Sequence, residues 1–261
     1  MTRPNLTATP LLVAALAGLT LTACDEAGGG GAAPHPAACT VDMDNEGSDA
    51  RLVLLQDGSR SKDGASEYSM TLATRILSDA SLEGPNLTIG TYGGSDAEIT
   101  FSTCFNSVHF RANFNQERRR REAAPGLIAA AVQDLENLPS GWTTTDTTSA
   151  LRAGAEKLRG SDEGERRLVI LTDGIPTAGC AQLPESTDPT DHQLIPELVE
   201  HCKATNAIPN LRGIDVVLIG VGRTGTGLTS ESVAFLTALN EALCEASDAN
   251  CTVAIDVPSD V

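Results

Sequence analysis

Aromatic residues are scarce in this chain of 261 residues, because Phe, Tyr and Trp together make up 3% of it. Its core must therefore consist mainly of Val, Leu, Ile and Ala, and we expect no platform that stacks nucleic-acid bases on aromatic side chains. Basic residues are also few, with 18 Lys and Arg against 35 Asp and Glu, for a formal net charge of −17. A surface this acidic repels nucleic acid and anionic lipid headgroups. Hydrophobic residues make up 41%, which suits one compact α/β domain.

Several motifs that mark enzymes and metal proteins are missing from the sequence. It has no Gly-x-Ser-x-Gly nucleophile elbow and no His-Glu-x-x-His pair, so there is little support for a hydrolase. It has no Cys-x-x-Cys, so the cysteine spacing does not fit a zinc site. Residues 220–225 fit Gly-x-Gly-x-x-Gly, but the acidic residue expected about 20 positions later is absent, and Asp256 lies 36 positions after Gly220. We therefore expect neither a dinucleotide site nor an enzyme.

The longest apolar run, Leu11 to Leu21, has 11 residues, whereas a membrane-spanning helix needs roughly 20. With Arg3 before it, the run predicts a signal peptide. It ends in Leu21-Thr22-Ala23-Cys24, which resembles the lipobox of bacterial lipoproteins. This resemblance implies that residues 1–23 are removed, and that acyl chains such as palmitate on Cys24 anchor the protein at the outer face of a bacterial cell membrane. The alternative is an ordinary signal peptide cut near Ala23.

The segment after Cys24 is rich in Gly, Ala and Pro over residues 25–38 and has little to bury. We therefore interpret residues 24–47 as a flexible tether and residues 48–261 as the folded domain. Assigning Cys24 to lipid leaves six cysteines, an even number that favours three disulfides in an exported chain. Six cysteines allow 15 pairings, and the sequence does not choose among them. Pairing near neighbours gives Cys39–Cys104, Cys180–Cys202 and Cys244–Cys251.

The folded part alternates strands and helices. Short apolar runs predict strands at residues 51–56, 87–92, 98–103, 168–172, 214–221 and 252–257. Helical spacing predicts helices at residues 66–82, 118–138, 148–158, 196–204 and 230–246, the last with Ser230 as its N-cap. Near-continuous apolar strands separated by helices indicate a doubly wound α/β fold, with a mostly parallel six-stranded sheet and helices on both faces. Turn residues 93–96 predict a hairpin that adds one antiparallel edge strand.

Oxygen-bearing side chains follow the predicted strands at one rim of this sheet, where ligands of such folds bind. Asp57, Ser59 and Ser61 follow the first strand, Thr145 precedes a helix, and Asp173 follows the strand at residues 168–172. An all-oxygen ligand set suits a hard cation, with Mg²⁺ first and Mn²⁺ or Ca²⁺ as alternatives. Since the hydroxyls are neutral, the ion keeps much of its charge. An open position on such an ion favours a carboxylate from a partner.

The order Asp57-x-Ser59-x-Ser61, then Thr145, then Asp173-Gly174 resembles the metal-ion-dependent adhesion site of the von Willebrand factor A domain. The resemblance covers about residues 48–258. It implies that Ser59 and Ser61 coordinate the ion directly and that Thr145 does so when a ligand is engaged. It also implies that Asp57 and Asp173 bind the ion directly or through water. The implied function is adhesion, in which a partner's Asp or Glu completes the coordination shell.

The chain also departs from this family, because only residues 258–261 follow the last strand, where the family has another helix whose shift controls affinity. We therefore do not carry the affinity switch of that family over to this chain. Two other functions stay open, a scaffold in a membrane-associated complex with a purely structural metal, and a metal-dependent hydrolase using Asp63 or Asp146 as its base.

N-capping is the alternative role for Ser59 and Ser61, and the expected role for Thr143, Thr144 and Thr148. The block of Arg118 to Arg121 is by default a solvated helix face, and otherwise a docking patch for an acidic partner near this rim.

Overall fold

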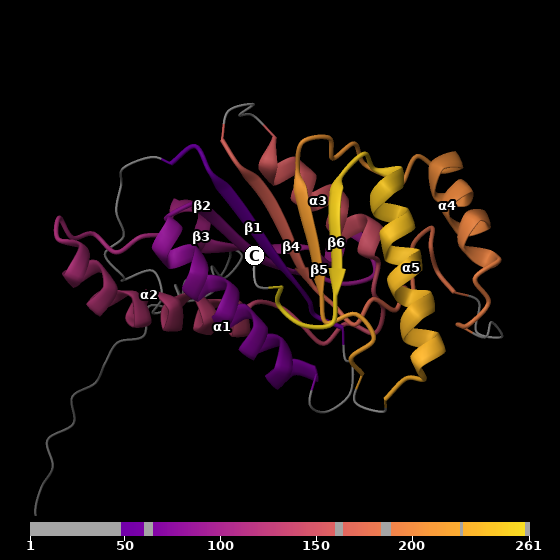
Figure 1. Ribbon diagram of the computed structural model, residues 1–261, viewed down its shortest axis with the longest axis horizontal. Helices are drawn as coiled ribbons and strands as arrows, with labels where there is room; N and C mark the ends of the chain where they lie inside the picture. Colours follow the sequence, from indigo (N-terminus) through magenta and orange to yellow (C-terminus); the bar gives the residue numbers. More distant parts are fainter. Residues whose placement is uncertain (1–47, 60–64, 160–163, 184–188, 225–226, 259–261) are drawn as a thin grey trace, which may run out of the picture. The chain divides into compact units, whose positions relative to one another are not determined.

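Six strands form the central sheet in a computed structural model that describes residues 48–59, 65–159, 164–183, 189–224 and 227–258 (Figure 1). Its order is β3-β2-β1-β4-β5-β6, and β3 alone runs antiparallel to its neighbour. The predicted mostly parallel sheet with one antiparallel edge strand is confirmed. The strands are β1 (Arg51–Asp57), β2 (Asn86–Tyr92), β3 (Thr100–His109), β4 (Arg166–Leu171), β5 (Asp215–Ile219) and β6 (Asn250–Ala254).

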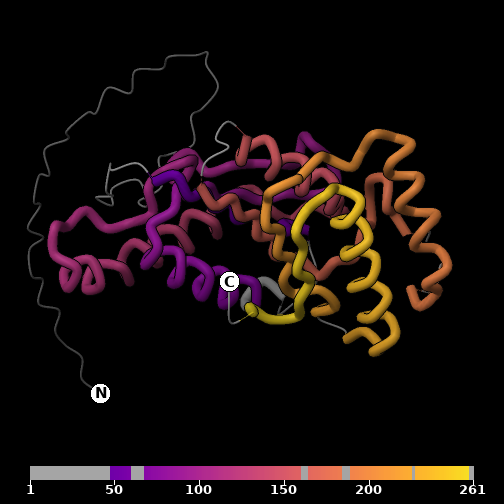
Figure 2. The backbone as a smooth tube through the Cα atoms, turned by 45° about the horizontal axis from the view of Figure 1, so that its top comes forward, coloured from indigo at the N-terminus to yellow at the C-terminus, as the bar shows by residue number. Residues whose placement is uncertain are grey.

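Helices cover both faces of the sheet because side chains along each buried strand alternate between the faces. Leu52 and Leu54 of β1 pack in the core beneath α1 and α2, whereas Val53 and Leu55 pack in the core beneath α3, α4 and α5. Both views show α4 and α5 side by side, with α5 next to β6 (Figures 1 and 2). The helices are α1 (Ala65–Glu83), α2 (Glu117–Asn137), α3 (Thr147–Leu158), α4 (Leu194–Ala204) and α5 (Ser230–Ala246). In the part of the chain that is described, no helix is both long enough and apolar enough to cross a membrane.

The ends of several elements differ from the sequence prediction. Residues 96–98 form a short 3₁₀ helix, η2 (Asp96–Glu98), so β3 begins at Thr100 rather than at Glu98 and continues to His109. The N-cap of α5 is Thr229, not Ser230, because the Thr229 hydroxyl accepts a hydrogen bond from the Ser232 amide at 3.1 Å. The sequence offers adjacent hydroxyl residues at this point, and only the backbone conformation distinguishes the cap from the first helical residue.

The last two strands are shorter than predicted. β5 ends at Ile219 because Gly220 adopts a φ of +97°, which turns the chain out of the sheet. β6 spans Asn250–Ala254, earlier than the predicted residues 252–257. The chain after β6 leaves the sheet, and Val257 is buried in the core beneath α1 and α2.

Two of the three predicted disulfides are present, Cys180–Cys202 and Cys244–Cys251. Cys104 is also disulfide-bonded, and its predicted partner, Cys39, lies outside the described residues. The signal peptide, Cys24 and the tether lie outside them as well. The disulfide Cys180–Cys202 connects the loop after β4 to α4, and the disulfide Cys244–Cys251 connects α5 to β6.

Candidate metal centre

Asp57 is the last residue of β1, and the parallel pairing of β1 with β2 places it opposite Tyr92. Its carboxylate accepts hydrogen bonds from three groups that lie far apart in the sequence. The Thr145 hydroxyl donates to Oδ1 and Oδ2 at 3.2 and 3.1 Å, and the Thr172 hydroxyl donates to Oδ2 at 3.0 Å. The Ser59 amide donates to Oδ1 at 2.9 Å. Asp57 is thus the point where the ends of β1 and β4 and the segment before α3 meet.

Asp173 follows β4 and lies in a turn that several backbone contacts hold. Its Oδ1 accepts a hydrogen bond from the Ile175 amide at 3.0 Å, and its carbonyl oxygen accepts one from the Gly222 amide at 2.8 Å. The next residue, Gly174, has a φ of +77° and its carbonyl oxygen accepts a hydrogen bond from the Asn240 side chain of α5 at 3.2 Å. The loops after β4 and β5 are therefore hydrogen-bonded to each other at Asp173, and Asn240 of α5 is hydrogen-bonded to the loop after β4.

Thr145 is held from both sides before α3 begins. Its amide donates to the Thr177 hydroxyl at 2.8 Å, and its carbonyl oxygen accepts from the amides of Thr177 and Ala178 at 3.1 and 3.0 Å. The next amide, of Asp146, donates to the carbonyl oxygen of Gly93 at 3.0 Å, just beyond the end of β2. The loop after Asp173 therefore fixes the position of Thr145, whose hydroxyl contacts Asp57.

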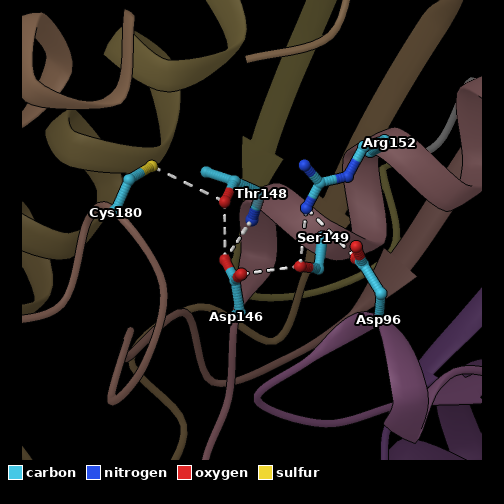
Figure 3. Close-up of polar contacts among 6 residues, drawn as sticks. All are labelled: Asp96, Asp146, Thr148, Ser149, Arg152 and Cys180. Carbon is cyan, nitrogen blue, oxygen red and sulfur yellow. Dashed lines mark hydrogen bonds and ion pairs between the residues drawn. The ribbon is translucent and has the colours of Figure 1, made fainter. Parts of the chain in front are cut away.

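Asp146 caps α3 and is fully engaged in doing so (Figure 3). Its carboxylate accepts hydrogen bonds from the Thr148 amide at 2.9 Å and from the hydroxyls of Thr148 and Ser149, each at 2.6 Å. The expectation that Thr143, Thr144 and Thr148 supply the cap is thus wrong, because Asp146 provides the accepting oxygen. This role occupies the carboxylate that was considered as a catalytic base, and the other candidate base, Asp63, lies outside the described residues.

The electrostatics of the rim favour a bound cation. Burial raises the pKa of Asp57, and burial together with the charge of Asp57 raises the pKa of Asp173 to about 6. Burial and the same two carboxylates also hold the pKa of Tyr92 well above its usual value. Among the described residues, neither carboxylate forms an ion pair, and the buried Tyr92 hydroxyl has no hydrogen-bond partner. Two half-buried carboxylates close together destabilise each other when both are ionised, and a cation bound between them would remove that cost.

A small recess opens between the two carboxylates. Its volume is about 20 Å³, and its lining includes Asp57, Thr172 and Asp173. A space of that size holds about one water-sized species. Within the described ranges no three or more His, Cys, Asp and Glu residues are grouped so that they could hold a metal ion, and the oxygen donors that line this recess include two carboxylates and the hydroxyls of Ser69 and Thr172. The recess and its donors fit a single hard cation.

Comparisons with known proteins give similarity at the level of structure alone. No model of a known family matches the chain, and no curated protein matches its sequence. A conserved hypothetical protein, BatB, from Bacteroides thetaiotaomicron is 14% identical with a TM-score of 0.43, over 81% of this chain and 92% of that one. The pilus adhesin SpaC from Lactobacillus rhamnosus GG is 14% identical with a TM-score of 0.43, over 84% of this chain and 29% of that one.

A third similar structure is the manganese-loaded TRAP protein from Plasmodium vivax, which is 18% identical with a TM-score of 0.37, over 74% of this chain and 63% of that one. The chain therefore spans less than a third of the adhesin and just under two thirds of TRAP. All three TM-scores are below 0.5, so the fold class rests on the sheet order and strand directions described above, and the likeness carries no functional conclusion.

The structure describes four of the five predicted ligands, and Ser61 lies outside the described residues. It brings Asp57 into contact with Thr145 and with the Ser59 backbone, and it places Asp57 and Asp173 around one recess. Sequence reasoning missed Thr172 as a hydrogen-bond donor at this site. Thr172 could have been found from its position at the end of a strand, directly before the predicted ligand Asp173.

The block Arg118 to Arg121 lies away from this rim. β3 runs antiparallel, so its last residue, His109, pairs with Asn86 at the start of β2, and α2 begins nearby, where Arg111 and Glu117 form an ion pair of 3.8 Å. The other end of α2 lies near the rim, because the Thr91 hydroxyl donates to the carbonyl oxygen of Pro139 at 2.8 Å. The alternative interpretation, a docking patch beside this rim, is therefore wrong. The block is a helix face with local ion pairs to Glu117 and Glu122.

Proposed function

We propose that this chain is an exported protein-binding module that recognises a partner's carboxylate through a bound divalent cation, most simply Mg²⁺. Asp57, Ser59, Ser61, Thr145 and Asp173 hold the ion, which supplies an electrophilic position for an Asp or Glu of the partner. The observation that supports this most directly is the recess lined by the half-buried carboxylates of Asp57 and Asp173, with the Thr145 hydroxyl hydrogen-bonded to Asp57. Acyl chains on Cys24 hold the module at the membrane surface.

The residues of the chain have separate tasks in this proposal. Asp57 and Asp173 provide the negative charge that attracts the ion. Thr145 and Thr172 orient the Asp57 carboxylate, since both hydroxyls donate hydrogen bonds to it. The loop at Thr177 and Ala178 keeps Thr145 in place, and Asn240 keeps the turn after Asp173 in place. In this proposal the module binds its partner and performs no chemical reaction.

Titration calorimetry with Mg²⁺ tests this function on the metal-free protein and its variants. Asp173→Ala removes a charged ligand and Ser59→Ala removes a neutral one, so we expect both variants to lose measurable Mg²⁺ binding while they stay folded through their disulfides. Asp79→Ala is the matched control, because Asp79 is an exposed carboxylate on α1 outside the recess, and it should bind Mg²⁺ like the wild type. Unchanged Mg²⁺ affinity in Asp173→Ala and Ser59→Ala would disprove the assignment.

A binding assay with and without chelator separates recognition from scaffolding. The wild-type protein is titrated with a synthetic glycine- and serine-based peptide that carries one glutamate, first in Mg²⁺ and then in EDTA. We expect binding in Mg²⁺ alone and no binding by Asp173→Ala. Equal binding in EDTA would show that the ion is structural and would favour the scaffold function.

A further inference from the structure

Arg223 lines the same recess as Asp57 and Asp173 but comes from a different loop. It follows β5, in a turn where Gly220 has a φ of +97° and the Arg223 amide donates to the Gly220 carbonyl oxygen at 2.9 Å. Its side chain is exposed to solvent. A cation therefore lies at the mouth of the recess in a chain whose net charge is −17.

The guanidinium group of Arg223 lies against an aromatic ring. Its Cζ lies 4.2 Å from the centre of the Tyr68 ring, and the Tyr68 hydroxyl donates to the carbonyl oxygen of Ile255 at 2.9 Å. This cation–π contact fixes the side chain but leaves the edge of the guanidinium available for hydrogen bonds. Restricting the side chain in advance lowers the entropy lost when a ligand binds.

Arg223 forms no ion pair among the described residues, although acids lie close to it. The neighbouring acid beside Tyr68, Asp256, pairs with Arg75 at 3.6 Å. Several other arginines of the described chain have a carboxylate partner within 4 Å, namely Arg111, Arg118, Arg120, Arg121, Arg152 and Arg212. Arg223 thus differs from these in two respects, its place at the recess and its lack of an acidic partner among the residues that the structure describes.

We propose that Arg223 is a second anchor for the partner, so that the module recognises an acidic segment with two carboxylates. One carboxylate completes the shell of the bound cation and the other pairs with the guanidinium of Arg223. This inference rests on the proposed function. Arginine suits the task because its planar fork binds a carboxylate through two parallel hydrogen bonds. The second anchor also explains how a chain with a net charge of −17 binds an acidic partner, because one carboxylate contacts the bound cation and the other contacts the Arg223 guanidinium.

Peptide binding in Mg²⁺ tests the second anchor. The probes are glycine- and serine-based peptides with either one glutamate or two glutamates at increasing separations. We expect the best two-glutamate peptide to bind the wild type about fivefold more tightly than the one-glutamate peptide. Arg223→Gln should bind both peptides alike, and its Mg²⁺ affinity should not be lower than that of the wild type, because the substitution removes a positive charge from the lining of the recess. Arg223→Lys should recover part of the preference, since it restores the charge without the fork.

Arg75→Gln is the matched control, because Arg75 is a nearby exposed arginine that pairs with Asp256, and this variant should keep the full preference. A preference that survives in Arg223→Gln, or its absence from the wild type at every separation, overturns the second anchor. If the one-glutamate peptide still needs Mg²⁺ in that case, the proposed function stands alone. If no peptide binds in a Mg²⁺-dependent manner, both ideas are wrong.

Discussion

Replacing Asp173 by Asn measures the cost of keeping two carboxylates together at the rim without a cation. The pKa of Asp173 rises from 3.8 to about 6 in the folded chain, mainly through burial and then through the charge of Asp57. One pKa unit corresponds to 1.36 kcal/mol, so a shift of about two units costs up to about 3 kcal/mol when the group is ionised. Asn has nearly the same shape and carries no charge, so it removes this cost.

The direction of the pKa shift of Asp173 determines the pH range in which Asp173→Asn changes the free energy of unfolding. A carboxyl whose pKa is raised on folding favours the folded state fully below its unfolded pKa of about 4, and this contribution is lost as the pH rises through about 6. Metal-free Asp173→Asn should therefore match the wild type near pH 4. At pH 7.5 it should be more stable than the wild type by up to about 3 kcal/mol. Saturating Mg²⁺ should reverse the order, since Mg²⁺ at a thousandfold excess over its Kd stabilises the wild type by about 4.1 kcal/mol and has no site in the variant.

Urea unfolding followed by tryptophan fluorescence gives these free energies directly. The chain has one tryptophan, Trp142, whose ring lies against the backbone at Gly58 and Gly93 near the rim. The measurements use metal-free protein with its disulfides intact, and Asp79→Asn is the control in which an exposed carboxylate is neutralised. A metal-free wild type that is as stable as Asp173→Asn at pH 7.5 would refute the electrostatic description of the rim.

Two further substitutions, with Gly126→Ala as a control for the first, test how the surrounding structure supports the rim. Gly179→Ala should destabilise the protein by about 2 kcal/mol in urea unfolding, because Gly179 has a φ of +77° and a Cβ there would lie 2.3 Å from Cγ of Asp146, the cap of α3. Gly126→Ala, in α2 and with nothing within 4 Å of the new Cβ, should be neutral or slightly stabilising, and equal effects would contradict this reasoning. Ser102→Ala should lower the free energy of unfolding in urea by about 2–3 kcal/mol. The buried Ser102 hydroxyl donates to the Asp134 carboxylate and accepts hydrogen bonds from two backbone amides. An unchanged urea midpoint would show that water replaces the hydroxyl.

The hydrophobic pattern was enough to predict the sheet and the helices, because most strands are buried on both faces. Leu168, Val169 and Ile170 are fully buried, and a short continuous apolar run of this kind is typical of a strand covered on both faces. Strand ends were less predictable, because they depend on the backbone of single residues. Gly220 ends β5 through its positive φ, and the sequence shows only that a glycine is present. The choice of Thr229 over Ser230 as N-cap has the same origin.

Those residues of the candidate site that follow from the order of the strands could be predicted from the sequence. Asp57, Thr145 and Asp173 come together because parallel strands end at one rim, which the strand order alone implies. Thr172 and Tyr92 were missed because their closeness to Asp57 depends on the register of β1 with its neighbours. The position of the arginine block was wrong because it depends on the length of β3, which carries the chain back to the opposite rim before α2 begins.

Crystals soaked in Mn²⁺ and measured at an anomalous wavelength test the central claim most directly, since Mn²⁺ substitutes for Mg²⁺ and its position is seen independently of the protein. We predict one anomalous peak per chain in the recess between Asp57 and Asp173, with the hydroxyl of Thr145 near it. The same peak should be absent from Asp173→Ala. A wild-type crystal without a peak in this recess, or with its peak at another place, would contradict the account.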